Sequence, residues 1–141
     1  MKVKILIVNA NYYSKISRDL VSDAIQTLDN NRIKYDLVNA PGAFEIPVII
    51  AKNIKKYDGF IAIGCVIKGE TPHFDFISKS TINGIMRLSI ESKKPIGNGI
   101  LTCLNIDQAK TRSDLRGQKR KGREAAEATL SVLGVLKNES K

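Results

Sequence analysis

The residues best suited to chemistry lie around the single histidine of this chain, His73. They follow an apolar run at 60–63 that ends at Gly64 and predicts a buried strand. Thr71 and Pro72, just before the histidine, predict the N-cap and the first residue of a helix. Free backbone N–H groups and the helix dipole at such a start attract anions. Because no Gly-Lys-Ser/Thr follows, the pattern predicts a phosphate beside a histidine and does not predict nucleotide hydrolysis.

Length and composition limit the kinds of protein that this chain can be. The 141 residues are 43% hydrophobic, which predicts one domain over 1–141 with a sizeable core. No apolar run approaches the roughly 18 residues of a membrane span, and residues 1–9 are typical of a first strand rather than a signal peptide. Cys65 and Cys103 form no disulfide framework and fall short of a zinc set even with His73. We therefore expect no metal, no membrane partner and a reducing cytoplasm.

The net charge of +9 is concentrated near the end of the chain. A solvated helix face, a cradle for an anionic substrate and a nucleic-acid surface would each explain such a concentration. No aromatic residue is interleaved with the charges, and this argues against a nucleic-acid partner. The basic cluster consists of Arg112, Arg116, Lys119, Arg120, Lys121 and Arg123, with Asp114 as its only acidic residue.

Apolar segments alternate with amphipathic ones along the whole chain. Strands are predicted over 3–8, 35–39, 60–63 and 95–101, with helices between them and a last helix striped over 125–136. This alternation predicts an α/β fold with an open, flavodoxin-like parallel sheet of about four strands and helices on both faces. Ligands of such folds bind beyond the carboxyl ends of the strands, where the loops of this chain are unusual. The sheet edges carry no protection, so association is expected.

Three segments together resemble the motifs of the lumazine synthase family. They are Pro-Gly-Ala-Phe-Glu-Ile-Pro at 41–47, Gly-Cys-Val-Ile-Lys-Gly-Glu-Thr-Pro-His-Phe-Asp at 64–75 and Asn-Gly-Ile-Leu-Thr at 98–102, and the resemblance runs from about Ile5 to Leu136. It implies the condensation of 5-amino-6-(D-ribitylamino)uracil with 3,4-dihydroxy-2-butanone 4-phosphate to 6,7-dimethyl-8-ribityllumazine, the penultimate step of riboflavin synthesis. The expected course is imine formation, loss of phosphate and ring closure, without a cofactor.

The resemblance also implies which residues hold the pyrimidine substrate. Tyr12 would stack on the ring where family members usually carry a phenylalanine preceded by arginine, whereas Asn11 precedes it here. Glu45 would hydrogen-bond hydroxyls of the ribityl chain, although an acid in a first helical turn also favours the helix dipole. The other expected contacts are Ala43 and Phe44 with the ribityl chain, and Cys65, Val66 and Ile67 along the uracil, with no redox role for the thiol.

Phosphate binding and proton transfer are implied for a further set of residues. Glu70 and Thr71 would bind the phosphate, mainly through backbone N–H groups, and Arg112 would reach it from a neighbouring subunit. His73 is the candidate for proton transfer, because a first helical turn disfavours the imidazolium and leaves a neutral ring able to accept a proton. Asn98 stands where some family members carry phenylalanine, which would make that wall of the pocket more polar.

The family builds each active site between subunits of a cyclic pentamer. The resemblance therefore implies a homopentamer in which Tyr12, Glu45 and His73 come from one chain and Asn98 and Arg112 from the next. We expect no closed capsid of pentamers, since the chain starts directly at its first strand. One alternative is a non-catalytic flavin or lumazine carrier of the same fold, and another is an enzyme that dismutates two lumazines. Residues 69–73 predict a phosphate site beside a histidine. Neither alternative needs such a site, so both are disfavoured.

Overall fold

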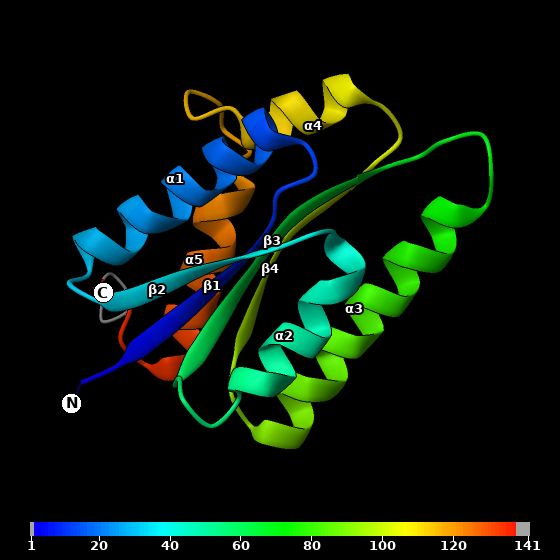
Figure 1. Ribbon diagram of the computed structural model, residues 1–141. Coiled ribbons are helices and arrows are strands. Elements are labelled where there is room, and N and C mark those ends of the chain that lie inside the picture. The colour runs from blue at the N-terminus through cyan, green and yellow to red at the C-terminus, as the bar shows by residue number, and fades with distance from the viewer. Residues whose placement is uncertain (1, 138–141) are drawn as a thin grey trace.

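Four parallel strands form one sheet in the order β2-β1-β3-β4 in the computed structural model of this protein, which describes residues 2–137 (Figure 1). Their bounds are β1 Lys4–Ala10, β2 Lys34–Ala40, β3 Gly59–Ile67 and β4 Ile96–Cys103. The two central strands, β1 and β3, are almost continuously buried, as expected where helices cover both faces of a parallel sheet. This confirms the predicted α/β class and its four-stranded open sheet.

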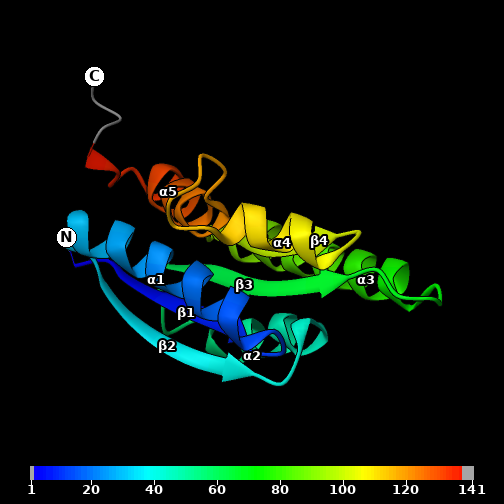
Figure 2. The same ribbon diagram turned by 90° about the horizontal axis from the view of Figure 1, so that it is seen from above.

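Helices cover both faces of the sheet (Figure 2). Buried side chains of α1 (Ser14–Asn30), α4 (Ile106–Ser113) and α5 (Lys121–Leu133) pack in one hydrophobic cluster with strand residues. The 3-10 turn η1 (Ala43–Glu45), α2 (Ile46–Asn53) and α3 (His73–Ser92) pack in a second cluster on the other face. The sheet between them thus supplies a rigid edge from which the loops project.

Two elements differ from the prediction. The third strand does not stop at Gly64 but continues to Ile67, because Gly64 packs closely in the core, where a Cβ would lie 3.2 Å from Ala10 Cβ. The helix α4 was not predicted. Its start carried a readable signal, an Asn-x-x-Gln pair in which the N-cap Asn105 Oδ1 accepts from Gln108 N at 2.9 Å, while Gln108 Oε1 accepts from Leu104 N, one residue before the N-cap, at 2.8 Å.

Gly97 allows α5 to lie against β4. A Cβ at this position would stand 2.1 Å from Ala125 O and 2.5 Å from Thr129 Oγ1, which itself donates to Phe60 O at 2.8 Å. We expect Gly97→Ala to lower the free energy of unfolding by about 3 kcal/mol, because backbone atoms must move to admit the methyl group. Urea unfolding measures the loss. Gly69→Ala is the matched control, since a Cβ there meets nothing within 4 Å, and equal midpoints for the two variants would contradict the prediction.

Candidate active site

Four loops meet at one edge of the sheet because all four strands are parallel. The segments 11–13, 41–45, 68–72 and 104–105 follow the carboxyl ends of β1, β2, β3 and β4 in turn, at the end toward which the strands run in Figure 1. Three of these segments hold residues that the sequence predicted for the substrate site. The fold therefore places them at the edge where ligands of open α/β sheets bind.

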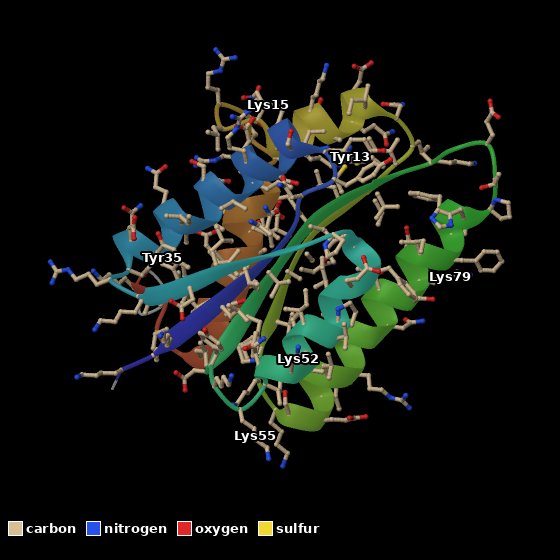
Figure 3. All side chains as sticks on the ribbon, in the orientation of Figure 1. Tyr13, Lys15, Tyr35, Lys52, Lys55 and Lys79 are labelled. Carbon is tan, nitrogen blue, oxygen red and sulfur yellow. The ribbon has the colours of Figure 1, made fainter. Side chains whose placement is uncertain are left out.

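Two aromatic side chains stand exposed at this edge. Tyr12 is 74% exposed and Phe44 is 59% exposed, so both rings are open to solvent and to a ligand. Tyr13, labelled in Figure 3, packs against the core and meets the ring of Tyr12 edge-on, with centroids 5.0 Å apart. The outer tyrosine thus rests on an anchored one and offers a ring face to a planar ligand.

The turn after β2 is anchored from beneath. Ala43 is buried, and its carbonyl accepts from Thr81 Oγ1 of α3 at 3.5 Å, so its side chain belongs to the core. Glu45 is half-buried in the last position of η1, and a Cβ on Gly42 would lie 3.3 Å from Glu45 Oε1. The glycine therefore leaves room beside this carboxylate. Of the predicted 43–45 contacts, Phe44 and Glu45 present side chains, while Ala43 can offer only its backbone.

The last residues of β3 have a strand on one side only. Pairing with β1 ends at Ile63, whereas pairing with β4 continues to Ile67. In residues 2–137, therefore, the backbone edge of 64–67 that faces β1 meets no strand. Unpaired N–H and C=O groups in a row can read the edge of a heterocycle by hydrogen bonds, which is the role predicted for Cys65, Val66 and Ile67.

Cys65 alternates with Val66 toward opposite faces of the sheet and is buried with Cys103 and Ile67 on the α1 side. Burial, with a smaller contribution from the nearby Cys103, raises the pKa of the Cys65 thiol to about 12. At neutral pH the thiol stays protonated, and a protonated thiol is a poor nucleophile.

A thiol with this pKa should react slowly with alkylating reagents. We expect Cys65 to remain unmodified by iodoacetamide at pH 8 in the native protein over a period that fully modifies the denatured chain, because the thiolate forms only as the pH approaches 12. Mass spectrometry of the peptide measures the modified fraction. Rapid native alkylation at pH 8 would show that the thiol is accessible and ionised.

The segment before α3 has free hydrogen-bond donors. In residues 2–137 the backbone N–H groups of Gly69, Glu70 and Thr71 donate to no other group of the chain, whereas Lys68 N donates to Cys103 O at 2.9 Å. Thr71 Oγ1 accepts from His73 N at 3.4 Å. Pro72 is the N-cap, so the helix begins one residue later than predicted. Free N–H groups at the start of a 20-residue helix suit an anion.

His73 is the first residue of α3 and is exposed. It stands just after the free N–H groups of 69–71, which suit an anion. The imidazole is therefore open to solvent at the edge of the sheet where the four loops meet.

Asn98 and Arg112 line a hollow of about 400 Å³ beside β4. Asn98 Oδ1 accepts from Ile100 N at 3.0 Å and Arg112 Nη1 donates to Gln108 O at 3.3 Å. Two more cations, Lys119 and Lys121, line the hollow together with one carboxylate, Glu124, so that three positive charges face one negative charge there. Lys119 had no predicted role of its own and was recognised only as part of the basic cluster.

The basic cluster is not one surface. Arg112, Lys119 and Lys121 share the hollow beside β4. Arg120 turns away and pairs with the buried Asp23 of α1, and the hydrogen bonds to this carboxylate raise the pKa of the guanidinium. Because its charges point in several directions, the cluster offers no continuous stripe for a nucleic-acid backbone.

Of five hollows on residues 2–137, one is lined by Asn98 and Arg112, and none of the five is lined by Tyr12, Glu45 or His73. Tyr12, Glu45 and His73 follow β1, β2 and β3, while the hollow of Arg112 adjoins the edge strand β4. Within residues 2–137, moreover, no three His, Cys, Asp or Glu side chains are grouped to hold a metal ion. None of the helices described is long and apolar enough to cross a bilayer.

Comparison with known proteins identifies the family. The sequence pattern of the family described as 6,7-dimethyl-8-ribityllumazine synthase matches residues 2–137. The chain belongs to this family. Proteins named 6,7-dimethyl-8-ribityllumazine synthase from Bartonella bacilliformis and Bartonella henselae are 42% and 44% identical, covering 94% and 96% of this chain and 90% of each relative. The protein of the same name from Agrobacterium fabrum is 40% identical, and the alignment covers 96% of each chain.

The segments at 41–47 and 64–75 that resemble lumazine synthase motifs include loops at the carboxyl edge of the sheet. A de novo designed Rossmann fold protein also aligns with 78% of the chain, at 13% identity and a TM-score of 0.39, which is too distant to support an argument. Membership is consistent with the separation of Asn98 and Arg112 from Tyr12 and His73 within one chain, since the resemblance implies that the two groups meet across subunits.

Proposed function

We infer that the chain is a 6,7-dimethyl-8-ribityllumazine synthase, a transferase that acts in riboflavin biosynthesis. It condenses 5-amino-6-(D-ribitylamino)uracil with 3,4-dihydroxy-2-butanone 4-phosphate. The observation that carries this inference is the full-length family match, over residues 2–137. The free N–H groups of 69–71 next to His73 add support, because they supply the phosphate site that this reaction requires.

We assign the pyrimidine substrate to the first group of residues. Tyr12 stacks on the ring, the unpaired backbone edge of 64–67 reads the uracil, and Glu45 with Phe44 meets the ribityl chain. The support is the exposure of the two aromatic rings and the missing strand partner beyond Ile63. Holding both substrates at one edge supplies much of the acceleration, since imine formation and ring closure need chiefly correct positioning.

The phosphate-bearing substrate is assigned to residues 69–71 and to Arg112. The amino group of the uracil attacks the ketone, water leaves as the imine forms, phosphate departs, and the ribitylamino nitrogen closes the ring with loss of a second water. His73 accepts and returns protons during these steps, beside the phosphate group. No step needs a metal or a cofactor.

We also propose that the chain forms a homopentamer in the cytoplasm, with each site completed by the next subunit. Large apolar side chains are exposed near both edges of the sheet, on the β4 side and on the β2 side. Such side chains support contacts between copies of the chain. Those on the β4 side are Met86 and Ile90 of α3, and those toward β2 are Leu37, Phe44 and Val48. A ring joins one such face to the other, head to tail.

Incubation of the purified protein with both substrates tests the function. We expect the fluorescent lumazine to form at the same rate with and without a chelator, because the described residues hold no metal-ligand cluster. Binding of the lumazine without turnover would instead identify a carrier. Strict dependence on a divalent ion would contradict the proposed mechanism.

A further inference from the structure

A carboxylate buried between α1 and α5 has three donors around it. The side chain of Asp23 in α1 is 3% exposed. Arg120 Nε donates to Asp23 Oδ1 at 3.1 Å, and Arg120 Nη2 forms a second, shorter bond to the same oxygen. Arg123 N donates to Asp23 Oδ2 at 3.0 Å. Both oxygens are thus engaged by residues almost a hundred positions later in the sequence.

This carboxylate serves as the N-cap that α5 lacks. Arg120, the N-cap residue, makes no side-chain capping bond, so the Arg123 N–H would be free without Asp23. The two helices also approach closely, because a Cβ on Gly122 would lie 2.2 Å from Leu20 O. The start of α5 is therefore fixed against α1 by a charged cap and by direct backbone contact.

The residues on either side of Arg120 face another way. Arg120 is the N-cap of α5, with φ −104° and ψ 88°, so the chain changes direction there as it enters the helix. Lys119 and Lys121 accordingly line the hollow that contains Arg112, while Arg120 reaches Asp23. The placement of two lysines in that hollow thus depends on where Arg120 is held.

We propose that Asp23 and Arg120 are positioning residues for the phosphate-bearing substrate. Their ion pair, in which the carboxylate is buried and the guanidinium partly exposed, fixes the start of α5 so that Lys119 and Lys121 stand beside Arg112 and add positive charge where the phosphate enters. The proposal rests on the proposed function of Arg112. A pair with a buried carboxylate suits this task, because loss of one partner leaves an uncompensated charge and the surrounding backbone rearranges.

Arg120→Met and Arg123→Met form a matched pair of variants. Each removes one guanidinium from the same turn, but the Arg123 side chain only approaches Glu127, at 4.0 Å on the surface. We expect Arg120→Met to raise the inhibition constant of inorganic phosphate and the KM for the butanone phosphate about tenfold, the size of one lost charge-assisted hydrogen bond. The KM for the uracil should stay within about twofold, as should all constants of Arg123→Met.

If the ion pair serves only folding, Arg120→Met will change both KM values alike or lower only the active fraction. Either result overturns the proposal. Unchanged constants for phosphate in folded Arg120→Met also overturn it. If that variant fails to fold, Arg120→Lys replaces it, since lysine keeps the charge and one donor to Asp23. It should then show a smaller but selective rise for phosphate. If the wild type forms no lumazine, the proposed function is refuted, but the role of Asp23 and Arg120 can still be tested. Equilibrium binding of inorganic phosphate then gives the same comparison between the variants.

Discussion

Replacement of Arg112 by alanine should raise the KM for the butanone phosphate between about tenfold and a hundredfold while the KM for the uracil changes little. Hydrogen bonds to a charged group contribute about 1.5–3 kcal/mol, and a factor of ten corresponds to about 1.4 kcal/mol. Arginine has five N–H donors, and in the described residues only Nη1 has a partner, Gln108 O at 3.3 Å. The remaining donors are available to the phosphate. Steady-state kinetics with each substrate varied in turn measures the effect.

Arg116→Ala is the control for this prediction. Arg116 belongs to the same basic cluster, but its side chain is 94% exposed and its Nε lies 3.8 Å from Asp114 Oδ1. Exposed pairs of this kind contribute little, so both KM values should stay at the wild-type level. Equal changes in Arg112→Ala and Arg116→Ala would show that net charge, and not a particular contact, controls phosphate affinity.

The sequence was sufficient to predict the fold because its strands are fully apolar and its breaks are well marked. The runs at 3–8 and 60–63 can be buried only in a sheet covered on both faces, and this is where β1 and β3 lie. The end of β3 was harder to predict. Gly64 looks like a strand terminator in sequence, yet it remains in the strand because Ala10 and Ile46 pack against its backbone.

The site was predictable where a motif is local and unpredictable where it depends on packing. The loop 68–72 and His73 follow directly from strand, turn and helix signals in adjacent residues. The burial of Ala43 depends on contacts with Gly64 and α3, which no local pattern reveals. The pairing of Arg120 with Asp23 likewise joins distant segments, so the basic cluster could not be divided from sequence alone.

The separation of the predicted residues into two groups leads to the last prediction. Tyr12 follows β1 and His73 comes after β3, the two inner strands of the sheet. Arg112 lies in the hollow beside the edge strand β4. If one chain supplies the first group and its neighbour the second, His73→Ala and Arg112→Ala damage opposite sides of each site. Each variant alone should be nearly inactive at low substrate concentration, since it lacks either proton transfer or the phosphate contact in all its sites.

If the chain forms the proposed pentamer, mixed rings of the two variants should regain activity. In a ring with heterologous contacts and random, equal incorporation, about one quarter of the sites combine an intact His73 side with an intact Arg112 side. We therefore expect about one quarter of the wild-type rate after the two chains are co-expressed or refolded together. Native mass spectrometry establishes that mixed rings have formed, and the lumazine assay measures the restored rate.

The matched control pairs His73→Ala with Tyr12→Ala. Both substitutions lie on the same side of the proposed site, so no mixture of these two chains can assemble an intact site, and activity should stay at the level of the separate variants. Restoration in the first mixture but not in this control would require sites shared between subunits. If mixed rings form and neither mixture gains activity, each site is complete within one chain, and the distance between the His73 loop and the hollow of Arg112 must close within that chain when substrates bind.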